Sequence, residues 1–567
     1  MAIIKKIRKR SNNLFFLMLL FFLLSVLIIY FSHISEGKLI AGDDFAFHKM
    51  RIEGLYESIM NGVYFPRLNM TFMNSMGYAS SIFYSDIFLY FPAILRTLGF
   101  SLAESYVSLL ILFNFITFSV AYFSMYIVEE KVNKSLLFSI LYTLSTYRLF
   151  DLTKRAALGE VLAFAFLPLA FMGLYQILYK NQKKWYYLTL GMSLIIFAHL
   201  LSAVLFALLI LVFLVLNWKE LYHNSARRNS FIKAVIFTIP LVMFYLLPIL
   251  EQLRSQDLRV STNPIVYISV AAMNLQDIIT QSLSNVSHLV NIGIVLLIFI
   301  MLYIIKIRHI KSKMTKHIFT SVLLFIFLST NLFPWKFFDK TFLNTIQFPW
   351  RFFTLITLCL CWVIAQDELN IFKHKKSTNY LMILVTLLSL SYSLNANQYM
   401  DNKIMSYGQF NEPSTYDIGF GKEYLPKKAN LDELMKYNLD LIYNNNELTT
   451  TNYNKNRDEI TFNFESSTKQ VVTLPLVYYK GYVAELIGTG ELSEPYLSKD
   501  GLLSIDVIGE GNVKVFYKGT ILQFITLYFS IGSWIIFTLW LILTREKKLS
   551  KEKVNFFNIP VLLKKEI

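Results

Sequence analysis

The sequence has little charge and almost no cysteine for its length. Only 16% of its 567 residues are Asp, Glu, Lys or Arg, whereas 55% are hydrophobic and 16% are aromatic; soluble domains carry roughly 25% charged residues. A water-soluble core cannot hide that much apolar surface, so the composition predicts a polytopic membrane protein. The two cysteines, Cys359 and Cys361, share one apolar run without further ligands nearby, which favours simple packing over a redox or metal site.

Several signatures of catalysis and transport are also missing. The chain has no GxxxxGKS/T phosphate loop, which argues against a nucleotide-driven motor. Its apolar runs lack the repeated charges that ion-coupled transporters place within the membrane. No Ser–His–Asp grouping can be assigned either.

Long apolar runs are what the sequence has in abundance. The first, residues 14–32, follows a basic segment and precedes no cleavage motif, so we expect a retained membrane helix with the N-terminus in the cytoplasm. Together with this run, further runs predict an α-helical membrane protein of about twelve spans: 105–127, 134–150, 159–179, 185–200, 203–217, 231–250, 288–305, 317–333, 350–366, 379–396 and 519–543.

The run 82–98 is an exception, because Asp86, Pro92 and Arg96 interrupt it. If this run is juxtamembrane or re-entrant, the loops and tails on the cytoplasmic side hold 29 of the 54 basic residues and 8 of the 38 acidic ones. The net charge of +16 is then explained by membrane topology, with both termini in the cytoplasm. It does not indicate a nucleic-acid partner.

The sequence divides into three regions. Residues 1–396 are expected to form the transmembrane domain, with a first outer loop and juxtamembrane helices at about 41–98. Residues 397–518 are less apolar and contain alternating patterns, which predict a mainly β, sandwich-like domain outside the membrane. Residues 519–567 supply the last span and a basic cytoplasmic tail.

The first outer loop holds the strongest candidate site. On a helix, Asp44, His48 and Arg51 stand at i, i+4 and i+7, so they share one face within roughly 60°. A carboxylate there can take a proton from an acceptor hydroxyl, and an arginine can neutralise a phosphate leaving group. These three are the predicted catalytic residues. The alternative is an interfacial helix whose polar face is only solvated.

Further residues on the expected outer side are predicted to bind substrate: Asp43, Arg155, Glu160, His199, Glu251, Gln347 and Arg351. Several have a structural alternative, such as a capping role for Asp43, an Arg155–Glu160 pair or a snorkelling Arg351. One carboxylate pair and one histidine are too few ligands to assign a metal. No metal-binding residue is therefore predicted, and a divalent ion stays open as a cofactor.

An ordered set of motifs covers most of the chain: Gly-Asp-Asp-Phe-Ala-Phe-His-Lys-Met-Arg at 42–51, Asn-Gly-Val-Tyr-Phe-Pro-Arg-Leu at 61–68, Arg-Ala-Ala-Leu-Gly-Glu at 155–160, His-Leu-Leu-Ser-Ala at 199–203, Gln-Phe-Pro-Trp-Arg-Phe-Phe at 347–353, Glu-Tyr-Leu-Pro at 423–426 and Leu-Pro-Leu-Val-Tyr-Tyr at 474–479. In these motifs the chain resembles the YfhO-like bacterial membrane proteins, a branch of the GT-C glycosyltransferase superfamily. Some relatives carry a label related to 6-pyruvoyl-tetrahydropterin synthase, but the three-histidine zinc site of a soluble enzyme is not visible in this sequence.

The resemblance implies a GT-C-like fold and an inverting enzyme. Such an enzyme transfers a sugar from a polyprenyl-phosphate-linked donor to a cell-envelope polymer, for instance a teichoic acid or polysaccharide, or to a glycolipid. It acts on the outer face of a bacterial plasma membrane, and its essential acid lies in the first outer loop, which is Asp44 here. The implied partners are the lipid bilayer, the donor, the polymer, a donor-making glycosyltransferase on the cytoplasmic face and a flippase.

Two other functions remain as alternatives. The chain could be a transporter or flippase for a lipid-linked envelope precursor, which moves lipid without making a glycosidic bond. It could also be a non-catalytic scaffold for envelope assembly, with the β-rich domain as its binding module.

Overall fold

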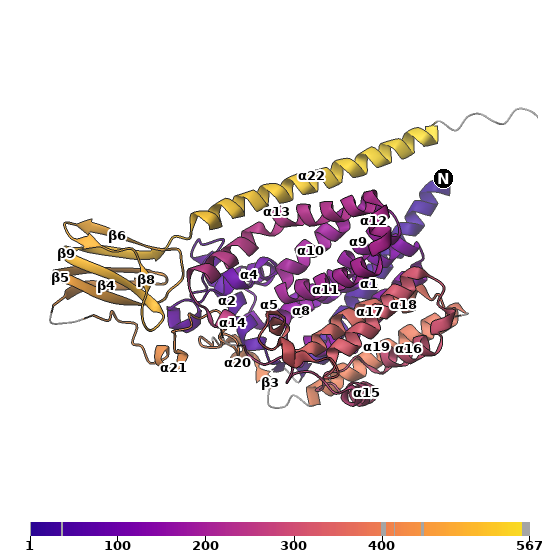
Figure 1. Ribbon diagram of the computed structural model, residues 1–567, viewed down its shortest axis with the longest axis horizontal. Coiled ribbons are helices and arrows are strands. Elements are labelled where there is room, and N and C mark those ends of the chain that lie inside the picture. The colour runs from indigo at the N-terminus through magenta and orange to yellow at the C-terminus, as the bar shows by residue number, and fades with distance from the viewer. Residues whose placement is uncertain are drawn as a thin grey trace, which may run out of the picture.

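The computed structural model describes residues 2–35, 38–262, 264–372, 374–398, 404–412, 414–443 and 447–557. The chain is mostly helical and carries a separate β-sheet domain near the C-terminus, as the sequence predicts. Figure 1 shows this sheet at one end of a bundle of helices, with the start of the first helix and the far end of the last helix at the other end.

Six helices of the described chain are long and apolar enough to cross a membrane. They are Leu14–His33 within α1 (Ala2–His33), Leu102–Glu129 (α5), Ser225–Ser255 (α13), Pro349–Gln366 (η7, Pro349–Phe352, with α18, Phe353–Gln366), Lys376–Ala396 within α19 (Lys375–Gln398) and Ile521–Thr544 within α22 (Ile521–Phe557). A seventh span exists if α8 (Leu158–Phe164) and α9 (Leu167–Tyr179), which are bent by 41° relative to each other, count as one.

The remaining apolar runs of the sequence also form helices, but shorter ones: α6 (Val132–Thr143), α7 (Thr146–Leu152), α10 (Tyr186–Ala198), α11 (Leu200–Leu216), α16 (Ile294–Ile305) and α17 (Lys313–Ser329). Those of 12 to 17 residues are about 18–26 Å long at 1.5 Å per residue, which is less than the roughly 30 Å of a bilayer core. The count of about twelve spans therefore stays a prediction.

Short helices cover the loops between these elements: α2 (Phe45–Met60), α3 (Ser80–Phe83), α4 (Tyr90–Thr97), α12 (Trp218–His223), α14 (Arg259–Thr262), α15 (Leu275–Ser284), α20 (Tyr407–Asn411) and α21 (Leu431–Leu434). The interrupted run 82–98 becomes η2 (Ile87–Leu89) followed by α4. Taken together, η2 and α4 (Ile87–Thr97) are about 16 Å long and are too short to cross a bilayer. That length is compatible with the juxtamembrane helix or re-entrant segment that the sequence predicts.

The β domain is one antiparallel sheet of six strands: β4 (Thr449–Asn456), β5 (Glu459–Val477), β6 (Tyr482–Gly488), β7 (Glu491–Leu492), β8 (Tyr496–Leu497) and β9 (Leu502–Tyr517). Ile460, Phe462 and Phe464 alternate with less buried neighbours along β5, as a sheet with one apolar face requires. The predicted sandwich is not seen among the described residues. The long strands β5 and β9 pair with each other, and β6, β7 and β8 share the other edge of β9, so these strands leave no second sheet.

A second, small sheet ties the first outer loop to the segment after α19. It has the order β1 (Ile34–Ser35), β2 (Lys38–Ile40) and β3 (Ile404–Ser406), with both pairings antiparallel. The sheet domain also contacts this loop directly, because the amide of Val477 donates to the carbonyl of Met76 at 2.9 Å. The first outer loop and the β-sheet domain therefore lie on the same side of the molecule.

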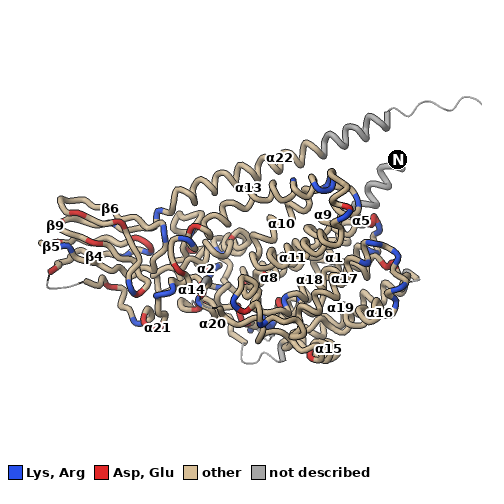
Figure 2. The backbone as a smooth tube through the Cα atoms, viewed as in Figure 1, with Lys and Arg blue, Asp and Glu red and all other residues tan. Residues whose placement is uncertain are grey.

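Charge is distributed unevenly along the helical bundle. Figure 2 shows groups of lysines and arginines at the end of the bundle that lies away from the sheet. At the sheet end, Gln252 of α13 joins the bundle to the sheet through two hydrogen bonds with the backbone of Lys480, at 2.7 and 3.1 Å.

Candidate functional site

The loop that carries the two aspartates is held by backbone hydrogen bonds to a distant segment. The amides of Asp43 and Asp44 donate to the carbonyls of Lys154 and Arg155 at 3.0 and 2.8 Å. Gly42 permits this approach, since a Cβ there would lie 2.5–2.7 Å from three atoms of the facing segment. A glycine in front of the aspartates therefore brings residues 42–44 against residues 153–156.

Asp44 has an exposed and unpaired carboxylate. It occupies the N-cap position of α2, but its side chain caps no amide. Its carboxylate forms no hydrogen bond or ion pair with the described part of the chain. The protein atoms around it nevertheless exclude much of the water. This desolvation raises the pKa of Asp44; the charges of Arg155 and Arg351 oppose the rise and that of Glu160 adds to it. A carboxylate in this state is suited to accept a proton.

Arg51 is engaged with the protein. Its Nη2 lies 2.8 Å from Oδ1 of Asp86 and donates to the carbonyls of Tyr84 and Ser85 at 3.0 and 2.8 Å. The guanidinium also lies 4.2 Å from the centre of the Tyr84 ring, and only 2% of Arg51 is exposed. The predicted contact between Arg51 and a phosphate therefore competes with internal contacts of Nη1 and Nη2, which hold the turn 84–86 against α2.

His48 lies buried beside Arg51, as their spacing on one helix predicts. Nη1 of Arg51 is 3.3 Å from Nδ1 of His48, and since a guanidinium can only donate, Nδ1 must be the acceptor. Burial lowers the pKa of His48, and the positive charge of Arg51 lowers it further. His48 is therefore neutral near pH 7 and carries its proton on Nε2.

Tyr84 is a central residue that the sequence analysis misses. Its ring stacks on the ring of His199, with centres 5.8 Å apart, and meets the ring of His48 edge-on at 5.5 Å. The hydroxyl packs so closely on Gly159 that a Cβ there would lie 1.7 Å from it. The sequence signal that points to this region is Asp86. This acidic residue lies within an apolar run, two positions after Tyr84.

His199 stands at a break between two apolar helices. It ends α10 and caps α11 with an extended backbone, at φ −161° and ψ 112°. Its Nδ1 accepts from the amide of Ser202 at 3.3 Å and lies 2.8 Å from the hydroxyl of the same residue. Neutral His199 therefore carries its proton on Nε2, which remains available to a ligand.

A buried ionic network joins residues that the sequence predicted separately. Nη1 of Arg155 lies 2.6 Å from Oδ1 of Asp151 and 2.9 Å from Oε1 of Glu160. Nε of Arg351 lies 2.9 Å from the same oxygen of Glu160, and its Nη1 donates to Gln347 at 2.7 Å. The Arg155–Glu160 pair is thus present, and Arg351 is drawn into the protein by Glu160.

Both arginines of this network keep donors that the protein does not use. Nη2 of Arg351, and Nε and Nη2 of Arg155, form no hydrogen bond with any described residue. The guanidinium of Arg155 lies over the ring of Trp350 at 4.8 Å, and that of Arg351 lies over Phe348 at 5.0 Å. Planar donors held against apolar rings are suited to a phosphate that carries a hydrocarbon chain.

Glu423 brings a further carboxylate from the segment between α20 and α21. It is partly exposed; desolvation raises its pKa, and the nearby charge of Asp44 adds to the rise while Arg351 opposes it. The next residue, Tyr424, stacks on Phe83 with ring centres 4.8 Å apart, which fixes the segment on α3. In the sequence, Glu423 belongs to one of the motifs of the family resemblance and is not among the predicted site residues.

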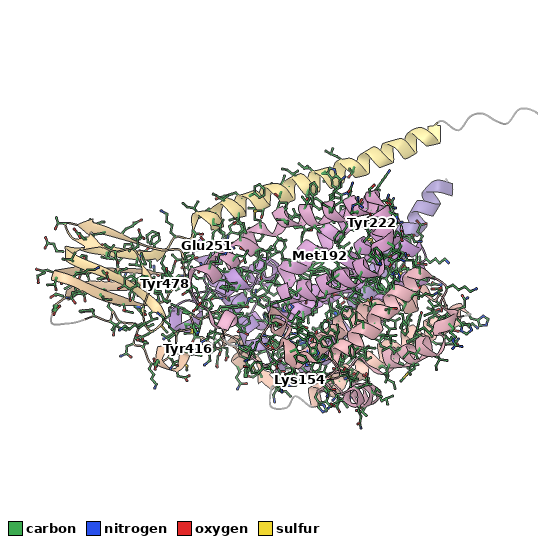
Figure 3. The ribbon with its side chains drawn as sticks, in the orientation of Figure 1. Lys154, Met192, Tyr222, Glu251, Tyr416 and Tyr478 are labelled. Atoms are coloured by element: carbon green, nitrogen blue, oxygen red, sulfur yellow. The ribbon has the colours of Figure 1, made fainter. Side chains whose placement is uncertain are left out.

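Two of the predicted site residues have partners elsewhere. Asp43 lies 3.0 Å from Nζ of Lys154 near the surface. Glu251 accepts from the hydroxyl of Thr520 at 2.6 Å and lies 3.5 Å from Nζ of Lys480. Figure 3 shows Glu251 at the junction of the helical bundle and the sheet, where it fixes the start of α22.

The described residues contain no group of three or more His, Cys, Asp or Glu side chains that could hold a metal ion. Cys359 and Cys361 are both buried within α18 as free thiols.

No protein-family model matches the chain. A protein of Lactococcus lactis subsp. cremoris (strain MG1363), described only as uncharacterized, is 24% identical to it over 363 residues, which cover 59% of this chain and 58% of that protein. The chain therefore spans little more than half the length of this relative.

Proposed function

We propose that this protein is a GT-C-type membrane glycosyltransferase, similar to the YfhO-like proteins. It transfers a sugar from a polyprenyl-phosphate-linked donor to a hydroxyl of a cell-envelope polymer or glycolipid. One observation carries the proposal. Asp44 is an accessible, unpaired carboxylate of raised pKa, and it lies beside Arg155 and Arg351, which keep unused donors.

The proposed reaction is a single displacement. The carboxylate of Asp44 accepts the proton of the acceptor hydroxyl. The acceptor oxygen forms a bond to the anomeric carbon on the face opposite the phosphate, so the configuration inverts. The bond between that carbon and the phosphate oxygen breaks, and its electron pair stays on the polyprenyl phosphate. Arg155 and Arg351 donate to this phosphate as its negative charge grows.

The other residues have supporting roles in the proposal. Arg51 is a positioning residue, because its donors hold the turn 84–86 and orient His48. His199 offers Nε2–H to the donor sugar or its phosphate. Glu423 belongs to the segment that leads into the sheet domain, so we assign it to the side of the site where the acceptor binds.

The proposed location is the plasma membrane of a bacterium, with about twelve spans and both termini in the cytoplasm. Three facts support it. Groups of basic residues lie at the end of the bundle away from the sheet (Figure 2), as the rule for cytoplasmic loops expects. The first outer loop contacts the sheet domain. The relative with 24% identity comes from a bacterium.

The test is Asp44→Asn in the full chain. Envelope polymers are isolated from a deletion strain that carries either the wild-type or the variant gene, and their sugar content is measured by mass spectrometry. Purified protein is also assayed with a panel of polyprenyl-phosphate sugars. Because the variant lacks the base, we expect sugar transfer to fall by about 100-fold or more. Transfer at the wild-type rate would show that Asp44 is not the base.

Two controls separate chemistry from folding. Asp440→Asn removes the same charge at an exposed position outside the site and should leave transfer unchanged. Asp44→Asn should unfold at a temperature no lower than the wild type. A raised pKa in the folded state means that stability falls as pH rises through that pKa, so a neutral side chain at position 44 does not destabilise the protein. Lipid movement without product in the wild type would favour the transporter instead.

A further inference from the structure

A cavity of about 490 Å³ lies among helix ends. Its lining comes from the first turns of α6, the end of α18 and the segment that leads into α19. The helices α5, α18 and α19 all pack against α6. None of the residues of the proposed active site lines this cavity, so it is a separate feature of the molecule.

The charged residues that line the cavity are two lysines and one aspartate. Lys131 is exposed, and its ammonium forms no hydrogen bond or ion pair with the described residues. Lys134 lies 3.2 Å from Glu129 and donates to the carbonyl of Gln366. Asp367 is the acidic lining residue, but its two oxygens accept from the amides of residues 371 and 372 at 2.7 and 3.1 Å. The charge of Asp367 is therefore already stabilised by backbone amides.

The interior of the cavity is apolar. Leu137, Ala365 and Phe372 line it, and Phe372 packs on Phe299 of α16 with ring centres 6.1 Å apart. A free phosphate needs donors on several sides and gains nothing from such walls. A phosphate that carries a glycerol and acyl chains can contact both kinds of lining residue. Its charge interacts with the lysines, and its apolar part packs on the apolar side chains of the cavity.

We propose that this cavity binds the head group of an anionic membrane phospholipid such as phosphatidylglycerol. Lys131 is the principal contact for the phosphate, and Lys134 forms the second side of the rim. The inference does not depend on glycosyl transfer and holds whatever reaction the protein performs. It does place this end of the bundle at the level of lipid head groups.

The experiment measures lipid retention by the purified full-length protein. Protein is extracted from nanodiscs that contain equal amounts of phosphatidylglycerol and phosphatidylcholine, and its bound lipids are counted by native mass spectrometry. We expect selective retention of phosphatidylglycerol by the wild type. Because a lysine near the head groups strengthens such binding by about fivefold, Lys131→Gln should weaken retention by about that factor.

A matched variant and a steric variant complete the design. Lys183→Gln removes the same charge from an exposed position in η3 (Gln182–Lys184), outside the cavity, and should retain lipid like the wild type. Thr378→Trp fills the cavity from its lining without changing charge and should abolish retention. Size-exclusion chromatography checks that each variant is folded.

Three results would overturn the proposal. The first is equal retention of both lipids by the wild type. The second is an equal effect of Lys131→Gln and Lys183→Gln, which would mean that charge acts without a site. The third is displacement of the lipid by inorganic phosphate at millimolar concentration, which would identify a soluble anion as the natural ligand.

Discussion

At the level of single residues, the site is defined by Asp44, whose carboxylate has no hydrogen-bond or ion-pair partner among the described residues. Asp86 is paired with Arg51, and Asp151 and Glu160 are paired with Arg155. Asp44 lies within reach of these charges without forming a bond to them. A protein that needed Asp44 only for structure would be expected to pair it, because a desolvated carboxylate without a partner destabilises the fold.

The pH dependence of transfer should report on Asp44. Its base form is the deprotonated one, and desolvation raises its pKa above the ordinary value of 3.8. Activity should therefore rise with pH through an acid limb that lies above pH 3.8. The measurement is kcat/KM against pH with a polyprenyl-phosphate sugar. A profile that stays flat down to pH 4 would assign the proton transfer to another group.

We expect Glu160 to contribute strongly to the free energy of unfolding, because its one carboxylate contacts both Arg155 and Arg351. Glu160→Gln leaves Arg155 and Arg351 with only Asp151 as a buried acidic partner. Breaking a buried ion pair on one side costs about 3–5 kcal/mol, so we expect the variant to unfold well below the wild-type temperature in detergent.

The control for Glu160 is a pair on the sheet. Glu459 lies 2.7 Å from Lys514, and both side chains are about 40% exposed. Glu459→Gln should cost about 0–1 kcal/mol, because exposed pairs are screened by water. Equal melting temperatures for Glu160→Gln and Glu459→Gln would contradict a structural role for Glu160.

At the scale of elements, breaks in helices bring the site together. The chain interrupts its apolar segments at residues 144–145, 153–157, 165–166 and 199. Two of these breaks carry site residues directly, since Arg155 lies in the turn between α7 and α8 and His199 separates α10 from α11. An unbroken helix would have satisfied its own backbone and left no turn for the loop 42–44 to pair with.

Gly42→Ala tests this pairing without touching a charged residue. The new Cβ would lie 2.5–2.7 Å from a carbonyl oxygen, an amide nitrogen and a Cβ of the segment 153–156. Since backbone atoms cannot move aside easily, we expect Asp44 to shift away from Arg155. Misplacement by about 1 Å can cost 100-fold in rate, so transfer should fall strongly although Asp44 is still present.

The matched control for Gly42→Ala is Gly532→Ala in α22. A Cβ at Gly532 meets no atom within 4 Å, and alanine favours a helix more than glycine does. This variant should transfer sugar like the wild type and should be at least as stable. A normal rate for Gly42→Ala would show that the backbone pairing does not position Asp44.

At the scale of the whole molecule, the sheet domain and the basic end of the bundle should lie on opposite sides of the membrane. The two natural cysteines are buried, so they should give little background with a membrane-impermeant maleimide. Asp440→Cys, near the sheet, should be labelled on intact cells. Lys183→Cys should be labelled only after the membrane is opened. The reverse pattern would invert the proposed topology and would place Asp44 in the cytoplasm.

Much of the architecture can be predicted from the sequence, but less of the site. The composition and the basic clusters predict a helical membrane protein with a β-rich domain before the last helix, and the structure confirms the helices and the separate sheet. The spacing of Asp44, His48 and Arg51 correctly places them on one helix from its N-cap onward. It does not reveal that Arg51 faces Asp86, because that contact joins α2 to the turn 84–86, 35 residues further along the chain.

The class of molecule follows from the sequence alone, since the length of apolar runs and the positions of basic residues are local properties that need no partner segment. The same is true of the residue types that are chemically able to act as a base or to bind a phosphate. Which of these residues are free to do so depends on the fold. Asp44 is unpaired while Asp43, Asp86, Asp151 and Glu160 are paired, because pairing depends on distances between segments far apart in the chain. Tyr84 and Glu423 enter the site for the same reason, through contacts that no local pattern records.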